Sequence, residues 1–372
     1  MKRLLLVGLF LTTKLFSQEF ETTFENSNFT LFVPLNSLGK HELVNYNRFR
    51  LTEHIRIDNW FLTAIGDIEN TLNINYINSY RTANIMIRSD TPFSTQTSTY
   101  NYKEGEIYSQ LYRLYAGYAD EKHRVSFGLQ RVSMGVGRIW NPTDLFNPKN
   151  PLALEPDEVY GSFSLVYTYS LSDLSEMTII AAQRADNSFK YLGRVKNYLD
   201  VLDVSFNIVN MNDVAMVGYE LEGELFNTGI ELRSEGGWFD DKIHKKRFFQ
   251  GLMGADFSFE NSLTFVGEWL HTSKTFKTDL KVTTPLGTAN NLVLSNDYLG
   301  MNVGYEFDAL LYGSLITIVS ADDGSFYLSP TLSYSLADDT TMRLGTMLNY
   351  GKRDSEFGNY GKTYYLNVNL TF

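Results

Sequence analysis

The sequence lacks cysteine altogether, so none of its 372 residues can form a disulfide bond or a thiolate metal site. Beyond the N-terminus it has no run of 18 or more apolar residues, and we therefore expect no transmembrane helix. Lys and Arg number 32 against 43 Asp and Glu, and the net charge of −11 argues against a nucleic-acid partner. The five histidines are scattered without metal-ligand spacing, so we expect neither a metal site nor another cofactor.

Aromatic residues and glycine are abundant instead, with 24 Tyr, 26 Phe and 27 Gly. The mean hydropathy of −0.21 is too polar for a helical membrane protein. A membrane β-barrel has this composition because half of its strand residues face water. The composition therefore favours one large β unit over several soluble domains.

The N-terminus has the pattern of a secretory signal peptide. Lys2 and Arg3 form a basic region, an apolar stretch runs from Leu4 to Thr13, and cleavage is expected after Ser17. We thus predict a signal peptide over 1–17 and a mature chain over 18–372. A short apolar N-terminal strand is the alternative.

The last nine residues alternate strictly between apolar and polar side chains and end on Phe372. This pattern resembles the C-terminal strand of Gram-negative outer-membrane barrels, which the barrel-assembly machinery reads. The resemblance implies that machinery as a partner. Alternation of the same kind recurs in earlier segments, namely 214–224, 248–258, 262–271, 298–306, 326–335 and 341–350.

The connections between these segments differ in length. Short turns are expected at 119–121, 171–175, 260–262, 307–309 and 337–340, and longer polar segments at 73–105, 132–158, 237–246, 272–296 and 351–361. Segments of about 10 residues suit tilted strands that cross a membrane. We predict an all-β fold: a single antiparallel transmembrane β-barrel of about 18 strands (or 16) in the outer membrane, surrounded by lipid, with short periplasmic turns and longer extracellular loops. Strands are least well defined in 19–42, 73–105 and 185–200.

Strand parity also predicts which charged side chains face the lumen. The predicted pore-lining residues are Arg48, Arg50, Arg56, Arg113, Glu220, Glu222, Glu224, Glu231, Asp256 and Glu268. Because the bases come early in the chain and the acids later, the two groups would face each other across the pore and produce a transverse field. Alternatively, these residues only solvate the lumen and pair between adjacent strands. Glu53 has the outward parity, which places it near a rim or at a bulge.

The alternation stops between Gln130 and Glu158, which contain four of the eight prolines. The segment carries an extended motif: Gly128, Gln130, Arg131, Gly135, Gly137, Arg138, Trp140, Asn141, Pro142, Asp144, Phe146, Asn147 and Pro148. It resembles the signature of a group of largely uncharacterised outer-membrane barrels and is more loosely similar to alginate-export-type porins. That resemblance implies a passive channel.

This 130–158 segment is expected to be an ordered inserted loop. Asn141-Pro142 and Asn147-Pro148 favour turns, and Asp144 can accept backbone hydrogen bonds from such a turn. We predict that the loop folds into the pore and constricts it, with Arg138, Trp140, Asp144 and Phe146 at the narrowing. The alternative is an external loop packed on the rim.

The sequence thus predicts a porin-like channel for passive diffusion of small hydrophilic solutes, without enzymatic activity. A barrel with a closed lumen and a structural or adhesive role is the alternative. A remote alternative is an outer-membrane phospholipase, because His271-Thr272-Ser273 resembles the core of that family's motif. The family's following Asn-Gly is absent here, and no orienting Asn was found for the His.

Overall fold

The computed structural model describes residues 18–35, 40–73, 90–274, 295–358 and 361–372, so the predicted signal peptide lies outside the described residues. Over these residues the chain forms nineteen antiparallel strands: β1 Gln18–Leu35, β2 Lys40–Ile57, β3 Trp60–Leu72, β4 Gln96–Tyr102, β5 Gly105–Ala119, β6 His123–Gln130, β7 Ser162–Ser172, β8 Ser175–Gln183, β9 Phe189–Leu199, β10 Leu202–Asn210, β11 Val214–Glu224, β12 Glu231–Asp241, β13 Lys246–Ser258, β14 Leu263–Thr272, β15 Asp297–Glu306, β16 Leu311–Ser320, β17 Phe326–Ala337, β18 Thr340–Tyr350 and β19 Thr363–Thr371.

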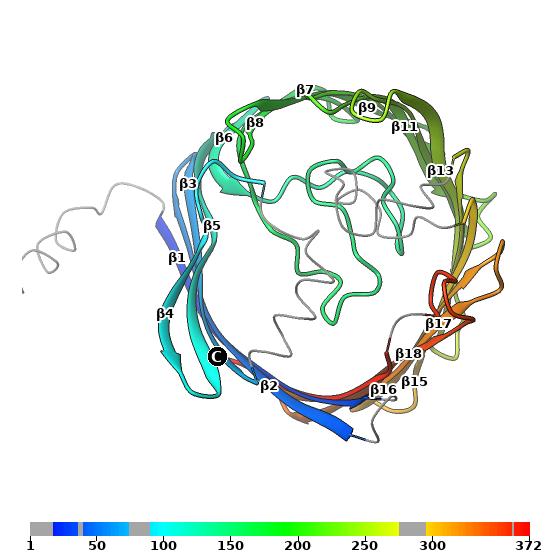
Figure 1. Cartoon of the computed structure of the whole chain (residues 1–372). Coiled ribbons are helices and arrows are strands. Elements are labelled where there is room, and N and C mark those ends of the chain that lie inside the picture. Colours follow the sequence, from blue (N-terminus) through cyan, green and yellow to red (C-terminus); the bar gives the residue numbers. More distant parts are fainter. Residues whose placement is uncertain (1–17, 36–39, 74–89, 275–294, 359–360) are drawn as a thin grey trace, which may run out of the picture.

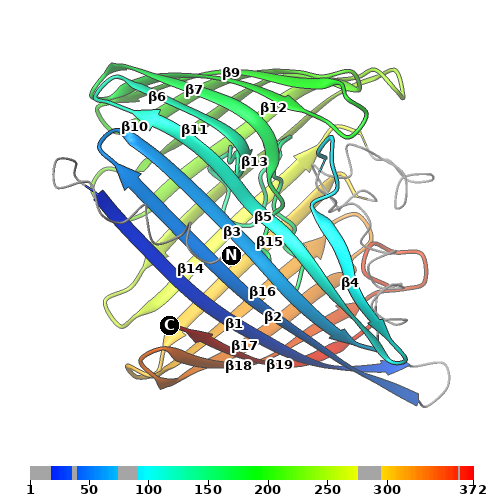
Figure 2. The ribbon, with the colours of Figure 1, turned by 90° about the vertical axis from the view of Figure 1, so that its left-hand side faces the viewer.

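The sheet closes on itself because β1 pairs with both β2 and β19 (Figures 1 and 2). The short strand β4 pairs only with β5, and β3 forms its own hydrogen-bonded pairing with β5. The closed ring therefore has eighteen strands, which confirms the predicted number. In the described residues, no helix is long and apolar enough to cross a membrane.

The two ends of the barrel differ in their connections. At one end, here called the short-turn end, consecutive strands are joined by turns such as 58–59, 173–174 and 338–339, and β1 begins beside the end of β19. The opposite, long-loop end carries 131–161 and 351–358. The prediction of a long connection over 237–246 was wrong, because β12 continues through Asp241 and only 242–245 remain between β12 and β13. Those residues close a tight hairpin, whose polar ends were misread as loop.

Side chains alternate between the outside and the inside of the ring. On β19 the outward face carries Tyr364, Leu366 and Leu370, while Asn367 faces inward and is buried. Alternation along the strands predicts a polar inner wall, but part of the inner wall is apolar. Near the long-loop end it carries inward apolar side chains, including Ile180, Leu192, Val209, Phe239, Leu252, Leu270 and Ile318. These residues face a part of the chain that lies inside this half of the barrel.

Candidate functional site: a segment held inside the barrel

Residues 131–161 connect β6 to β7 and run inside the ring rather than over its rim (Figure 1). They form no helix or strand, so their backbone groups need partners of another kind. The partners come from the segment's own side chains and from inward side chains of strands on both sides of the barrel. We call 131–161 the inner segment.

Asp144 organises the fold of the inner segment itself. Its carboxylate accepts hydrogen bonds from the backbone N–H groups of Phe146 at 2.9 Å, Asn147 at 2.7 Å and Met134 at 3.2 Å. Asn147 Oδ1 in turn accepts from Val132 N at 2.7 Å. Asp144 is 1% exposed, and burial raises its pKa to about 6 although these N–H groups oppose the shift. The carboxyl therefore fixes the turn but is costly to ionise.

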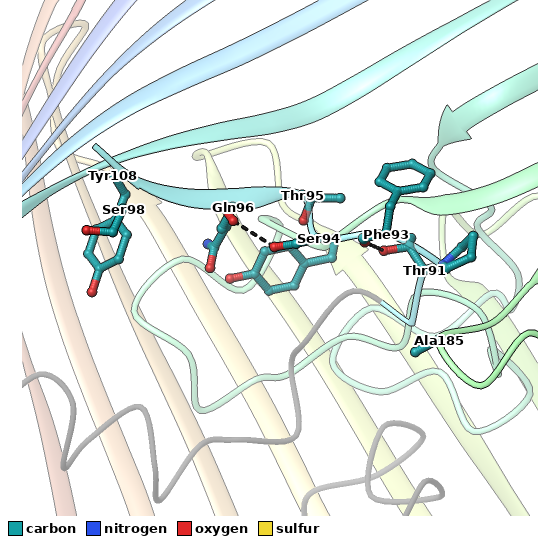
Figure 3. Close-up of a pocket in the computed structure, with 10 residues that line it drawn as sticks. Thr91, Phe93, Ser94, Thr95, Gln96, Ser98, Tyr108 and Ala185 are labelled. Carbon is teal, nitrogen blue, oxygen red and sulfur yellow. Dashed lines mark hydrogen bonds between the residues drawn. The ribbon is translucent and has the colours of Figure 1, made fainter. Parts of the chain in front are cut away.

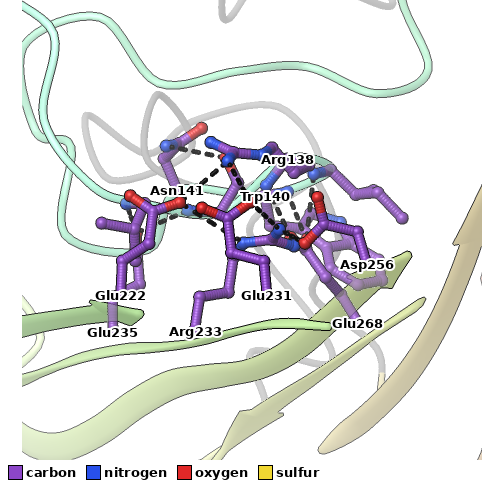
Figure 4. A network of polar contacts seen from close by, with 12 residues as sticks. Arg138, Trp140, Asn141, Glu222, Glu231, Arg233, Glu235, Asp256 and Glu268 are labelled. Carbon is purple, nitrogen blue, oxygen red and sulfur yellow. Dashed lines mark hydrogen bonds and ion pairs between the residues drawn. The ribbon is translucent and has the colours of Figure 1, made fainter. Parts of the chain in front are cut away.

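Three buried carboxylates on one side of the barrel bind the backbone of the inner segment, and Figure 4 shows two of them, Glu235 and Glu268. Glu220 of β11 accepts from Gly135 N at 3.0 Å. Glu235 of β12 accepts from Val136 N, from Gly137 N at 3.0 Å and from Thr143 N at 3.2 Å. Glu268 of β14 accepts from the backbone N–H groups of Arg138, of Ile139 at 2.9 Å and of Trp140 at 3.2 Å. We call Glu220, Glu235 and Glu268 the carboxylate anchor.

Gly135 shows why this approach needs glycine. Its φ is 84°, in the left-handed region, and a Cβ added there would lie 2.4 Å from Glu235 Oε2. No larger residue could keep both the backbone conformation and the contact. Gly135 of the motif thus allows the backbone to approach the carboxylate of Glu235.

Arginines on the other side of the barrel bind acidic side chains of the inner segment. Arg48 of β2 donates two hydrogen bonds to Glu155 in a bidentate ion pair, at 2.9 and 3.1 Å. Arg50 forms the same kind of pair with Glu158, at 2.9 and 3.0 Å. Arg50 is itself held by buried Asp67 of β3 at 2.7 Å. The ion pair with Arg50 lowers the pKa of Glu158 against the opposing effect of its burial.

A β-bulge completes this arginine side. The β3–β5 register shifts so that Ile65 pairs with Arg113 and Gly66 with Leu111, leaving Tyr112 unpaired. The guanidinium carbons of Arg50 and Arg113 each lie 4.0 Å from the centre of the Tyr112 ring. Arg113 also donates to the backbone carbonyl of Val159. We call Arg48, Arg50 and Arg113 the arginine anchor.

Apolar packing supplements the two anchors. Phe146 is 6% exposed and packs with Val209 and Met216 of the wall. Trp140 is 3% exposed and packs with Leu252 and Tyr298. Gly300 of β15 makes room for the indole, since a Cβ there would lie 2.6 Å from its Cη2 atom. The two aromatic residues predicted at a narrowing are therefore seated against the wall.

Arg138 of the inner segment lies beside β11 and β12, and its side chain stays 44% exposed. It donates to Glu222 at 2.8 Å and to Glu231 at 3.1 Å, beside buried Arg233 (Figure 4). Arg233 pairs with Asp256 and lies 3.5 Å from Glu268. These alternating charges occupy the side of the inner segment that faces the short-turn end.

The remaining predicted pore residues lie away from the inner segment. Arg56 and Glu224 are exposed, near the short-turn end of β2 and β11. The predicted distribution of bases and acids on opposite walls is present, but most of these charges bind the inner segment instead of facing each other across open water. A bare transverse field between the two walls therefore does not describe this barrel. Glu53 faces outward near the short-turn rim and accepts from Thr22 at 2.9 Å.

Sequence reasoning missed several residues of this arrangement. Glu235, Asp67, Glu155 and Glu158 were not predicted as site residues. Their inward parity or their place in the proline-rich stretch was visible, but their partners lie 17 to 108 residues away in the chain. A further missed group joins Asp90 to Arg184 at 2.8 Å and to Lys190 at 2.9 Å, and Lys190 also donates to Leu145 O. Basic partners lower the pKa of Asp90 to about 2.

The His271-Thr272-Ser273 sequence does not form a complete nucleophilic site. His271 Nδ1 lies 2.9 Å from Asp297 Oδ1, so Asp297 supplies the orienting group that sequence reasoning had not found. Ser273 Oγ, however, accepts from Phe249 N at 2.9 Å, and among the described residues it makes no hydrogen bond with His271. Within the same described part of the chain, no group of three His, Cys, Asp or Glu side chains is arranged to hold a metal ion.

A polar pocket lies near the long-loop end, between the segment preceding β4 and the inner segment (Figure 3). Its walls include Phe93, Gln96, Tyr108, Tyr160 and Ala185. Hydroxyl, amide and aromatic groups would suit a small polar solute. Tyr160 belongs to the inner segment, so the pocket and the inner segment share a wall.

No family model and no curated protein matches the chain. Solved structures do match along nearly the whole chain. OccK5 (OpdH) of Pseudomonas aeruginosa aligns with a TM-score of 0.64 and 11% identity over 95% of this chain and 98% of that one. OccAB4 of Acinetobacter baumannii gives 0.60 and 12% over 96% and 98%. The outer membrane protein OpdK of P. aeruginosa gives 0.60 and 11% over 95% and 98%. The chain therefore shares the closed barrel fold of these proteins.

Proposed function

We propose that the protein is an outer-membrane channel through which small hydrophilic solutes diffuse passively, with the inner segment as a fixed constriction. The observation that carries the proposal is the position of the inner segment, which is held in the lumen by side chains of strands on opposite walls. A segment anchored in this way narrows a barrel whose ring is wide enough for an aqueous lumen. The long-loop end would then be extracellular and the short-turn end periplasmic.

Exposed inward residues support an aqueous path on the short-turn side of the inner segment. Glu21 and His54 face each other on the inner side of β1 and β2, as do Glu19 and Arg56, and Arg343 faces inward on β18. All five residues are exposed to solvent although they point into the ring. These five residues would line the passage together with the exposed side of Arg138 and the inward Glu222, Glu224 and Glu231.

The similar structure of OpdK with vanillate shows that a barrel of this fold holds a small organic molecule. We extend only the size class to this chain. The resemblance of the 130–158 motif to uncharacterised outer-membrane barrels, assembly through the strand ending at Phe372 and export by the 1–17 segment belong to the same proposal.

Conductance across a planar lipid bilayer tests the proposal directly. The refolded protein should give stable single-channel currents. Deletion of residues 139–152 should increase the conductance, because it removes part of the inner segment, including Ile139, Trp140 and Thr143, which bind the carboxylate anchor. A folded barrel that carries no current would disprove the channel. Equal conductance with and without 139–152 would disprove the constriction. Liposome swelling with sugars, amino acids and organic acids would then identify the solute class.

A closed barrel with a structural or adhesive role is the second candidate. It is favoured by the two buried apolar clusters that join the inner segment to the wall, since they fill that part of the lumen. The two roles predict opposite results in the same bilayer measurement. Phospholipase activity is a separate test, and activity lost on Ser273→Ala would assign catalysis to the outer face.

A further inference from the structure

Aromatic side chains border a band on the outer face of β1 and β19. Toward the short-turn end, the rings of Phe24 and Phe372 stack with centroids 5.8 Å apart. Toward the long-loop end, Phe32 and Tyr364 lie 6.2 Å apart. Two such rows mark the interfaces of a barrel that spans a membrane. The outward residues of β1 between Phe24 and Phe32 should therefore face the hydrocarbon.

Those residues are polar. They are Asn26, Asn28 and Thr30, and the neighbouring strands add Asn45 and Asn47 on β2 and Asn70 on β3. We call these six residues the asparagine ladder. Asn26 donates to Asn47 Oδ1 at 2.8 Å, Asn45 donates to Asn28 Oδ1 at 3.1 Å and to Thr30 Oγ1 at 3.0 Å. The ladder is thus an ordered network across the outer faces of two strands.

The strand on the other side of β1 has the opposite character at the same level. In the β1–β19 register, Asn26, Asn28 and Thr30 pair with Leu370, Val368 and Leu366. Elsewhere the outward band carries exposed apolar residues such as Phe206, Ile208, Leu299 and Leu332. Among the described strands, only β1 and β2 present two outward amide side chains each. The ladder is a local feature of the surface rather than its general composition.

The network leaves hydrogen-bonding capacity unused. Among the described residues, the side-chain amides of Asn47 and Asn70 donate no hydrogen bond, and both residues are half-buried and face outward. Lipid chains offer no acceptor, so such groups are costly in a membrane unless another protein surface meets them. Asparagine side chains that face lipid stabilise contacts between membrane segments for this reason.

We propose that the asparagine ladder is the contact surface of a two-fold dimer, in which the ladder of one copy meets the ladder of a second copy. This inference rests on the proposal above that the barrel spans a membrane. An amide carries both donors and acceptors, so the ladder is complementary to itself. A surface that pairs with its own copy gives a two-fold dimer, whereas a head-to-tail ring would leave each ladder against apolar band residues.

Cysteine substitution tests the contact, because the natural chain has none. Asn28 and Asn47 pair directly between β1 and β2, so Asn28→Cys and Asn47→Cys both place a thiol within the ladder. Thr317→Cys is the control, since Thr317 faces outward on β16, where it pairs with Met301 and Leu328. The full-length protein in phospholipid vesicles would be treated with a short bis-maleimide. We expect covalent dimers from both ladder variants and none from the control.

A second variant separates contact from folding. Asn28→Leu/Asn47→Leu should fold, because it makes the band more apolar, and should shift wild-type dimers to monomers in single-molecule photobleaching counts while leaving the conductance per barrel unchanged. Monomeric wild-type protein, three-copy products, cross-links only from Thr317→Cys, or a double variant that stays dimeric would each overturn the proposal. Cross-linked dimers without current would contradict the channel alone, so the two proposals fail separately.

Discussion

The arginine anchor and the carboxylate anchor hold the same segment by different chemistry. The carboxylates receive backbone N–H groups, so they fix the path of the main chain whatever its side chains are. Arg48 and Arg50 instead donate hydrogen bonds to the side chains of Glu155 and Glu158, which remain 24% and 29% exposed. Removing a buried carboxylate should be costly, because each backbone N–H group that it binds would be left without a partner. Removing one member of an ion pair that is open to water should cost less. The inner segment is therefore held rigidly on one wall and more adjustably on the other.

The largest effect should follow from removing carboxylates. Glu235→Ala/Glu268→Ala leaves six backbone N–H groups without these acceptors, at roughly 1–3 kcal/mol for each that stays buried. The inner segment should detach, so conductance rises and iodide quenches Trp140, which is otherwise 3% exposed. Glu224→Ala is the matched control for docking, because Glu224 is exposed and, among the described residues, makes no hydrogen bond or ion pair with the inner segment. It should leave Trp140 as protected from iodide as in the wild type. Unchanged Trp140 quenching in the double variant would show that apolar packing alone holds the segment.

Removing an arginine should have a smaller effect. Arg48→Ala loses the contact with Glu155, worth about 1.5–3 kcal/mol for hydrogen bonds between charged groups. We expect the segment to stay docked on the carboxylate side, with modestly higher and noisier current. Arg56→Ala, exposed on the same strand and away from the inner segment, is the control for docking and should leave Trp140 as protected from iodide as in the wild type. An Arg48→Ala effect as large as the carboxylate double variant would reverse the ranking of the two anchors.

Packing on the carboxylate side can be tested without touching a charge. Gly300→Ala places a methyl group against the Trp140 ring and should destabilise docking by about 1–3 kcal/mol. Gly193→Ala is the control, because a Cβ there meets nothing within 4 Å. Urea titration in vesicles, followed by Trp140 quenching, gives the midpoint urea concentration at which the inner segment detaches in each variant. Equal midpoints would mean that the indole is not seated against β15.

The smallest effect concerns pH. Burial raises the pKa of Asp144 to about 6, so the Asp144 carboxyl binds a proton more tightly when the inner segment is docked than when the segment is released. The contribution of Asp144 to docking should therefore weaken as pH rises from about 4 to 6 and stay constant above. Glu158, whose pKa is lowered, acts in the opposite sense and loses its contribution only as pH falls below about 4.5. The difference in Trp140 quenching between wild type and Asp144→Asn should vary between pH 4.5 and 7. A difference independent of pH would contradict the buried ionisation.

Much of the barrel could be predicted from the sequence, because alternation along each strand reports directly on which face meets lipid. The eighteen-strand ring, the outward Leu366 and Leu370 and the contrast of loop lengths follow from this local rule. Parity also placed Glu220 and Arg48 inside. It could not show that they bind the inner segment, since contacts such as Arg48 with Glu155 depend on where a segment without periodicity runs. The bulge at Tyr112 and the room left by Gly300 have no local signature either.

A disulfide between the inner segment and the wall tests the central claim most directly. A Cβ on Gly218 of β11 would lie 3.3 Å from Thr143 Cγ2, close enough for Thr143→Cys and Gly218→Cys to bond across the contact. If the inner segment is a fixed constriction, the bond should form without rearrangement, and single-channel conductance should be the same before and after reduction. Failure of the bond to form in the folded barrel, or a conductance that rises on reduction, would contradict the account.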